Sequence, residues 1–264
     1  MTYRLMNNGW AAGRGLAALL VLALLVGCAG TGNTQERNPV DPWEGFNRKV
    51  FVFNDALDRA VLKPVARGYR FVTPSPVQTG VGNFFSNLGE PRTVLNSLLQ
   101  GKPGNAAVAT GRFLINTTLG IGGLWDFATH MAITGMEEDF GQTLGVWGLD
   151  EGPYLVLPLF GPSTVRDTGG MPVDMATYPT TYVEDDKIRY GLTALRIIDT
   201  RAGFLDQEAL IQGDRYSFIR DTWLQRRRFE VSDGDLGDDP FAGDDFDFDD
   251  ADFEASESGD APSD

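Results

Sequence analysis

A long apolar stretch interrupted by glycines constrains the fold of this chain most. Residues 113–135 contain one carboxylate, that of Asp126, and no lysine or arginine. The glycines at positions 120, 122 and 123 argue against one uninterrupted membrane helix, because glycine in a helix interior is destabilising. The sequence therefore predicts two short apolar helices that join at these glycines. They belong either to a core or to an element that dips into one leaflet of a membrane.

The N-terminal segment is typical of an export signal that ends in a lipidation site. A basic start precedes an apolar run over residues 16–26, which is shorter than the roughly 20 residues needed to cross a bilayer core. Leu25-Val26-Gly27 then precedes Cys28, the only cysteine of the chain, in the order that a lipoprotein signal peptidase reads. We expect residues 1–27 to be removed and Cys28 to be acylated, which anchors the chain stably once several acyl groups are attached. The alternatives are an ordinary signal peptide and a buried free thiol.

The residues from Cys28 onward divide into a tether, a body and a tail. Ala29 favours sorting to the outer membrane, since an aspartate there would favour retention in the inner membrane. Residues 28–40 are small and polar and predict a flexible tether. Residues 41–229 carry the apolar pattern of a folded domain, whereas residues 230–264 hold 15 of the 37 acidic residues and no lysine or arginine. The net charge of −15 therefore belongs to the tail, and no basic excess indicates nucleic-acid binding.

The acidic tail has too few apolar residues to order itself, so we expect it to be disordered. Four phenylalanines interrupt its acidic residues: Phe241, Phe246, Phe248 and Phe253. Acidic residues spaced by aromatics are typical of a segment that docks in a basic, apolar groove. The alternative is a solvated segment that adds only solubility.

The body is expected to be mainly α-helical. Asp41-Pro42 is a helix-start signal, and apolar residues at helical spacing follow it from Phe46 to Val61, until Pro64 breaks the pattern. Further helices are predicted over residues 77–88, 91–99, 138–148, 187–200 and 214–229. Tyr154–Leu157 is the best strand candidate, and a turn is predicted at residues 161–163.

The chain offers little support for an enzyme. It lacks the Gly-x-Ser-x-Gly elbow of a serine esterase, and His130 is its only histidine, which excludes zinc sites with two or three histidines. Gly80-Val-Gly82 and Gly120-Ile-Gly-Gly123 do not follow a convincing strand, so they are not dinucleotide fingerprints. Glu137-Glu138-Asp139 fits a cation site or a general base, but an acidic helix N-terminus explains it more simply. We expect no enzymatic activity, no cofactor and no metal.

A series of motifs in the body resembles the MlaA (VacJ) family of lipoproteins. In chain order they are Asp41-Pro-Trp-Glu-Gly-Phe-Asn-Arg48, Lys63-Pro-Val-Ala66, Asn83-Phe-Phe-Ser-Asn-Leu-Gly-Glu-Pro91, Leu98-Leu-Gln-Gly101, Arg112-Phe-Leu-Ile-Asn-Thr-Thr-Leu-Gly120, Glu138-Asp-Phe-Gly-Gln-Thr-Leu-Gly145, Gly152-Pro-Tyr-Leu-Val-Leu-Pro158 and Gly161-Pro-Ser-Thr-Val-Arg-Asp167. The motifs cover residues 41–167, and a looser match extends to residue 229. Several independent motifs in one order, behind a lipidation signal, argue against a chance match.

The resemblance implies a lipid-anchored protein of the outer membrane that faces the periplasm of a Gram-negative bacterium. Members of this family take phospholipid that has strayed into the outer leaflet and pass it to a soluble periplasmic carrier protein, which maintains lipid asymmetry. They are mostly helical, form a ring in the inner leaflet with an amphipathic channel, and commonly associate with trimeric porins. We therefore expect a ring-like bundle of short amphipathic helices with at most a short strand or hairpin, lying in one leaflet.

The resemblance also makes the apolar stretch a candidate for contact with the leaflet. The expected contact residues are Phe113, Leu114, Ile115, Leu119, Ile121, Leu124 and Trp125. A lipid path needs polar groups for the headgroup and apolar walls for the tails. The candidate polar residues are Asn116, Thr117, Thr118, Arg166 and Asp167, although Asn and Thr are equally common in caps and turns. Two other functions stay open: a structural outer-membrane scaffold without transport, and a lipid hydrolase.

Overall fold

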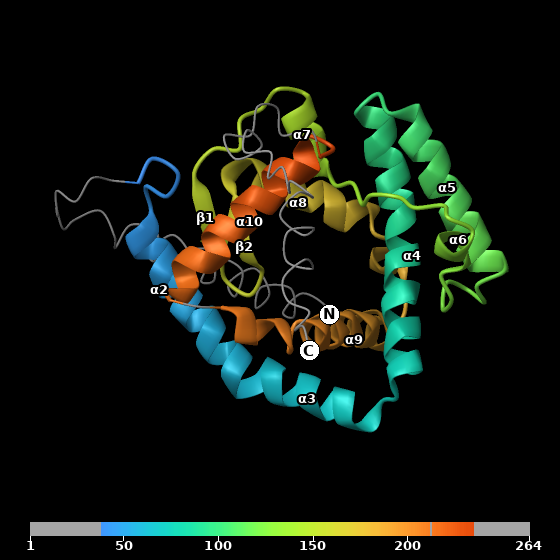
Figure 1. The fold of residues 1–264 in the computed structure, drawn as a ribbon, viewed down its shortest axis with the longest axis horizontal. Helices are drawn as coiled ribbons and strands as arrows, with labels where there is room; N and C mark the ends of the chain where they lie inside the picture. The colour runs from blue at the N-terminus through green and yellow to red at the C-terminus, as the bar shows by residue number, and fades with distance from the viewer. Residues whose placement is uncertain (1–37, 212, 235–264) are drawn as a thin grey trace, which may run out of the picture.

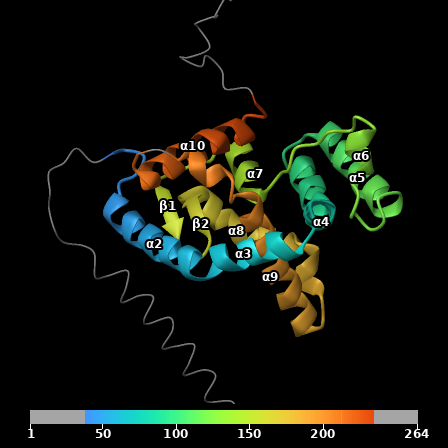
Figure 2. The ribbon, with the colours of Figure 1, turned by 60° about the horizontal axis from the view of Figure 1, so that its bottom comes forward.

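The protein, seen in a computed structural model that describes residues 38–211 and 213–234, is mainly helical, which confirms the predicted fold class. Figure 1 shows the longer helices arranged as the sides of a ring. The ring helices are α2 (Glu44–Leu57), α3 (Lys63–Val72), α4 (Ser75–Leu99), α8 (Val165–Thr177), α9 (Asp186–Gly203) and α10 (Arg215–Val231), together with the shorter α7 (Phe140–Val146). α5 (Pro103–Thr118) lies outside the ring. In Figure 2, α9 projects to one side of the ring, and α5 lies on its outer side against α4. No helix of the described residues is long and apolar enough to cross a membrane.

α2 and α3 form one long side of the ring because a π-helical turn carries the chain past Pro64. The turn, Asp58–Leu62, is wider than an α-helical one, and the amide of Lys63 closes it by donating to the carbonyl of Asp58. Proline has no amide hydrogen, and its ring clashes with the carbonyl four residues earlier in a regular α-helix. The wider turn accommodates that ring. The predicted break at Pro64 is therefore wrong, and the helical path continues to Val72.

α4 is a single helix where the sequence predicted two, over residues 77–88 and 91–99. Pro91 lies inside it and cannot donate a hydrogen bond to the preceding turn. Because α4 packs along α5 and also contacts α7, α8 and α9, tertiary packing compensates for that loss. Glu90 on α4 and Arg112 on α5 are both buried, and Nε of Arg112 lies 2.8 Å from Oε1 of Glu90.

The glycines of the apolar stretch form the turn between α5 and the one-turn helix α6 (Phe127–His130), which confirms the predicted pair of helices. Gly122 and Gly123 have φ angles of 71° and 90°, which favour glycine. A Cβ on Gly120 would lie 2.1 Å from the carbonyl oxygen of Trp125, so the turn closes only on a glycine there. The amide of Gly123 donates to the carbonyl of Asn116 at 2.8 Å. The turn is therefore tightly hydrogen-bonded.

Asparagine side chains join α2 to the hairpin formed by β1 (Tyr154–Leu157) and β2 (Gly161–Thr164). Nδ2 of Asn47 donates to the carbonyl of Tyr154 at 3.0 Å, and Oδ1 accepts the amide of Val156 at 2.9 Å. Asn54, two turns further along α2, makes the equivalent pair of hydrogen bonds at the end of β1. The main buried hydrophobic cluster joins this hairpin to α10 and contains Tyr154, Val156, Tyr216 and Leu224.

Residues 161–177 form more regular structure than the sequence predicted. The expected turn is the strand Gly161–Thr164, because it pairs antiparallel with β1. Helix α8 was not predicted, since two glycines and Pro172 disfavour a helix over its sequence. Close packing explains the glycine at position 170, because a Cβ there would lie 2.8 Å from the amide nitrogen of Gly141, where α8 crosses α7.

The two predicted C-terminal helices are confirmed as α9 and α10, with slightly longer bounds. α10 ends at Val231, two residues past the expected end of the body. Beyond it, Oδ1 of Asp233 accepts a hydrogen bond from Nζ of Lys102 at 2.6 Å, which fixes the end of α10 near the start of α5. The predicted signal segment, Cys28, and the tail residues 235–264 lie outside the described residues.

Candidate functional site

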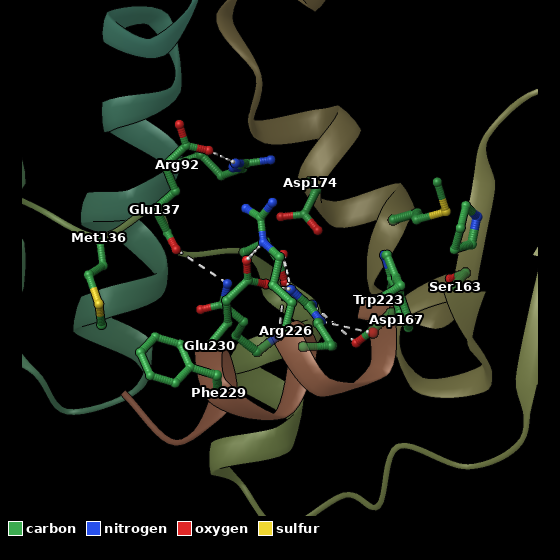
Figure 3. Close-up of a pocket in the computed structure, with 15 residues that line it drawn as sticks. Arg92, Met136, Glu137, Ser163, Asp167, Asp174, Trp223, Arg226, Phe229 and Glu230 are labelled. Carbon is green, nitrogen blue, oxygen red and sulfur yellow. Dashed lines mark hydrogen bonds and ion pairs between the residues drawn. The ribbon is translucent and has the colours of Figure 1, made fainter. Parts of the chain in front are cut away.

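A pocket of about 880 Å³ lies where α4, α8 and α10 face one another. Its charged lining residues are Arg92, Glu137, Asp139, Asp167, Asp174, Arg226, Arg227 and Glu230. Its apolar lining residues are Met136, Pro162, Met171, Trp223 and Phe229. Figure 3 shows these side chains converging from separate elements of the fold. The pocket therefore offers both charged and apolar walls to a ligand.

Arg227 on α10 is paired with two carboxylates of the pocket. Its terminal nitrogens donate to both oxygens of Asp139 at 2.6 and 2.7 Å, and its Nε donates to Oδ2 of Asp167 at 2.9 Å. A Cβ on Gly141 would lie 2.5 Å from Oδ1 of Asp167 and 2.6 Å from Nη2 of Arg227, so glycine leaves room for this group. Burial acts to raise the pKa of Asp139, but the hydrogen bonds from Arg227 outweigh it and hold that pKa below its usual value.

Asp174 on α8 and Arg92 on α4 are less fully paired. Oδ1 of Asp174 accepts the amide of Phe140 at 2.9 Å, and among the described residues it forms no ion pair. Burial, with a smaller contribution from nearby Asp139, raises the pKa of Asp174 to about 6. The guanidinium of Arg92 lies 3.7 Å from the carboxylate of Glu137, and its buried Nε has no hydrogen-bond partner in the described structure. Asp174 and Arg92 thus keep spare bonding capacity at partly buried positions of the pocket.

Two of the predicted polar path residues lie at the pocket or next to it. Asp167, in the first turn of α8, lines the pocket, and its amide donates to the hydroxyl of Thr164 at 3.2 Å. Arg166 is outside the lining, with a side chain that is 6 % exposed, and its Nε donates to Oδ1 of Asp167 at 3.1 Å. Arg166 therefore helps to position Asp167 from outside the pocket lining.

The other three predicted path residues are on α5, away from the pocket. Asn116 is buried, and its amide group donates to Oδ1 of Asp126 and accepts from the amide of Ala128, both at 2.9 Å. The hydroxyl of Thr117 accepts a hydrogen bond from α4, and that of Thr118 donates to a carbonyl within α5. In this structure these three side chains connect local elements rather than line the pocket.

The predicted leaflet-contact residues surround the turn between α5 and α6. Five of them are exposed, namely Leu114, Leu119, Ile121, Leu124 and Trp125. Phe113 and Ile115 are half-buried. Ile121 is 71 % exposed and has a φ of 54°, a left-handed conformation that is costly for a β-branched residue. The turn therefore presents an apolar side chain to the surroundings despite local strain.

Sequence reasoning missed most of the charged residues of the pocket. Arg227 lies in a run of three arginines at the end of α10, where a solvent-exposed cation is common, but its side chain is 8 % exposed whereas that of Arg226 is 72 % exposed. The available signal was spacing, because Arg227 follows Trp223 by four residues and so shares its face of α10. Asp174 lies in α8, which was not predicted, and Arg92 follows the proline at which a helix boundary was expected.

A mainly helical ring with an amphipathic pocket among its helices defines the class of this protein. The chain belongs to a family within that class: the model of the MlaA lipoprotein family matches residues 39–230.

Known relatives support this assignment. The chain is 40 % identical over 229 residues to the intermembrane phospholipid transport system lipoprotein MlaA of Escherichia coli (strain K12), covering 83 % of this chain and 89 % of that protein. It is 37 % identical over 233 residues to the protein of the same name from Haemophilus influenzae, covering 84 % and 91 %. A solved structure described as "Structural basis for maintenance of bacterial outer membrane lipid asymmetry" superposes with a TM-score of 0.64 and 38 % identity, covering 72 % of this chain and 98 % of that one.

Proposed function

We propose that this chain is an outer-membrane lipoprotein that removes misplaced phospholipid from the outer leaflet and passes it to a soluble periplasmic carrier. Relatives at about 40 % identity are named as lipoproteins of an intermembrane phospholipid transport system. The solved structure that resembles the ring concerns the lipid asymmetry of the outer membrane. In this role the chain maintains that asymmetry without itself catalysing a reaction.

The amphipathic pocket is the observation that supports this proposal most strongly. A phospholipid joins a charged headgroup to apolar tails, so its passage needs polar partners beside apolar walls. Arg92, Asp167 and Asp174 supply charge, and Met171 and Trp223 supply apolar surface in the same pocket. Asp167 therefore remains our candidate for the lipid path, with Arg166 positioning it.

The turn between α5 and α6 is proposed to contact the membrane. Its exposed Ile121, Leu124 and Trp125 form an apolar surface outside the ring. The half-buried Phe127 packs against the ring of Trp125 beside them. Tryptophan is favoured at the boundary between apolar lipid and water. A short element of this kind enters one leaflet without spanning the membrane.

Anchoring and partners complete the proposal. Acylation of Cys28 holds the chain to the outer membrane on its periplasmic side, and residues 28–40 serve as the tether. A trimeric porin is the proposed neighbour in the membrane. The acidic tail is proposed to dock on the periplasmic carrier through its phenylalanines and charge. Removal of the tail then weakens capture of the carrier most at low ionic strength, where screening is least.

A deletion strain tests the proposed function. Its outer leaflet gains phospholipid, measured as acylation of lipid A by a surface enzyme or as accessibility to added phospholipase, and the wild-type gene reverses the gain. An envelope defect with normal asymmetry would instead support a scaffold. Release of lysophospholipid or fatty acid by the purified protein would support a hydrolase.

A further inference from the structure

The charged side chains of the pocket differ in how fully they are paired with one another. Arg227 is held by Asp139 and Asp167, which leaves its guanidinium little capacity for a ligand. Arg226 pairs with Glu230, and its side chain is 72 % exposed, so water solvates its remaining donors. Asp167 also receives a hydrogen bond from Arg166 behind it. Arg227, Asp139, Asp167 and Arg166 thus form a connected network at the wall of the pocket.

Arg92 is the largely buried cation of the pocket that keeps spare donors. Its nearest carboxylate, that of Glu137, is 3.7 Å away and belongs to a side chain that is 70 % exposed, so this pair is weak. The Arg92 side chain is only 17 % exposed, and its Nε finds no acceptor among the described residues. An unsatisfied buried guanidinium nitrogen is costly, and a phosphate oxygen would satisfy it.

Asp174 is the anion that keeps spare acceptors. One of its oxygens accepts the amide of Phe140, and within the described residues no basic side chain pairs with it. Asp139 lies near enough to repel its charge, while Arg92 and Arg227 attract it only from a distance. A primary ammonium group, with three N–H donors, would supply the missing partner.

These two side chains face the same pocket from neighbouring helices, Arg92 from α4 and Asp174 from α8, as Figure 3 shows. From this geometry we infer that the pocket binds a zwitterionic headgroup, with the phosphate of a phosphoethanolamine lipid at Arg92 and its ammonium group at Asp174. The inference rests on the proposed function, because it specifies which phospholipid class that pocket prefers. An anionic lipid such as phosphatidylglycerol brings a phosphate for Arg92 but leaves Asp174 without a counter-charge.

Calorimetry on the purified, acylated mature protein in detergent tests the inference. The probes are dihexanoyl phosphatidylethanolamine and dihexanoyl phosphatidylglycerol, each below its micelle concentration. We expect the wild type to bind the ethanolamine lipid about tenfold more tightly, the effect of one charge-assisted hydrogen bond. Asp174→Asn brings the two dissociation constants together, chiefly by weakening the ethanolamine lipid. Arg92→Gln weakens both lipids by about tenfold and leaves their ratio largely unchanged.

Matched controls separate recognition from misfolding. Asp186→Asn and Arg59→Gln make the same chemical changes at exposed side chains outside the pocket, so they leave both dissociation constants unchanged. Thermal unfolding of each variant checks that the fold is retained. A further variant, Asp174→Glu, preserves the charge and is expected to retain the preference for the ethanolamine lipid, even if the protein binds that lipid less tightly.

Three outcomes overturn the headgroup site: equal affinities in the wild type, an unchanged ratio in Asp174→Asn, or no binding of either lipid. None of them touches the proposed function if the deletion strain still accumulates surface phospholipid. Conversely, a deletion strain with normal asymmetry removes the proposed function whatever the calorimetry gives. The two failures are therefore distinguishable.

Discussion

Arg227 on α10 donates to both carboxylate oxygens of Asp139, at 2.6 and 2.7 Å, although the two residues are 88 positions apart in sequence. The pair joins the last helix of the body to the start of α7, and the same guanidinium reaches Asp167 on α8. Three segments therefore meet at one buried cation. This junction shapes the wall of the pocket on which the proposed function depends.

Loss of that cation is expected to be severely destabilising. Arg227→Met leaves the largely buried Asp139 without its counter-charge and Asp167 with Arg166 alone, so we expect the free energy of unfolding to fall by about 3–5 kcal/mol. Urea denaturation followed by circular dichroism measures it. The neighbouring Arg226→Met changes an exposed pair and is expected to cost less than about 1 kcal/mol. Equal losses in the two variants would show that the buried junction has no special role.

The pH dependence of stability is expected to carry the signature of Asp174. Burial raises its pKa in the folded protein to about 6, with Asp139 repelling and Arg92 and Arg227 attracting its charge. The folded state therefore binds the proton more tightly, and the stability that this gives at low pH is lost as the pH rises through about 6. Asp174→Asn removes the ionisation and should gain about 1 kcal/mol at pH 7, after allowance for solvent screening, and nothing at pH 4.

Urea denaturation of the wild type and Asp174→Asn between pH 4 and pH 7 checks this prediction. The difference in unfolding free energy between the wild type and Asp174→Asn should grow with pH. Asp139, which both proteins keep, has a pH effect of the opposite sign, because its lowered pKa gives stability that disappears only as the pH falls through that lowered value. A difference that stays constant across the range would mean that Asp174 titrates normally.

Asn47 is expected to matter more for stability than Asn54. Asn47 is fully buried, and its removal leaves the carbonyl of Tyr154 and the amide of Val156 without partners. We expect Asn47→Ala to lower the free energy of unfolding by about 2–4 kcal/mol, whereas Asn54→Ala, at a half-buried site, should cost about 1 kcal/mol. Thermal unfolding compares the variants directly. The reverse order would contradict the view that Asn47 substitutes for a strand partner of β1.

Ile121 is expected to strain the backbone locally while it contributes an apolar side chain to membrane contact. Its φ of 54° favours glycine, so Ile121→Gly should leave the melting temperature unchanged or raise it slightly. The same change removes an exposed apolar side chain and is expected to weaken vesicle binding, measured by flotation in a Cys28→Ala background that lacks the acyl anchor. Undiminished flotation would argue that the turn between α5 and α6 does not touch lipid.

Much of the fold was predictable because it depends on local patterns. The helical spacing from Phe46 onward, the strand Tyr154–Leu157 and the glycine break between α5 and α6 all follow from nearest-neighbour chemistry. Where prediction failed, long-range packing overrode a local signal. Pro64 and Pro91 lie within continuous helical paths because a π-turn and the packing of α4 absorb them, and Gly170 sits inside α8 because α7 crosses it there.

The pocket was harder to predict for the same reason. Asp167 lies in a motif and was chosen from the sequence, whereas Arg92, Asp174 and Arg227 come together only when α4, α8 and α10 meet. Nothing in local sequence distinguishes buried Arg227 from exposed Arg226 except its spacing from Trp223. Asn116 was chosen as a polar residue in an apolar stretch, but its side chain holds α6 in place.

Surface phospholipid in a deletion strain tests the central claim most directly, when the strain is complemented with either the wild type or Met171→Trp. The larger side chain fills the apolar wall of the pocket, and outer-membrane abundance and thermal unfolding confirm that the variant is present and folded. We predict that surface phospholipid rises on deletion, returns to normal with the wild type, and stays high with Met171→Trp. Normal asymmetry in the deletion strain, or full rescue by a blocked pocket, would contradict it.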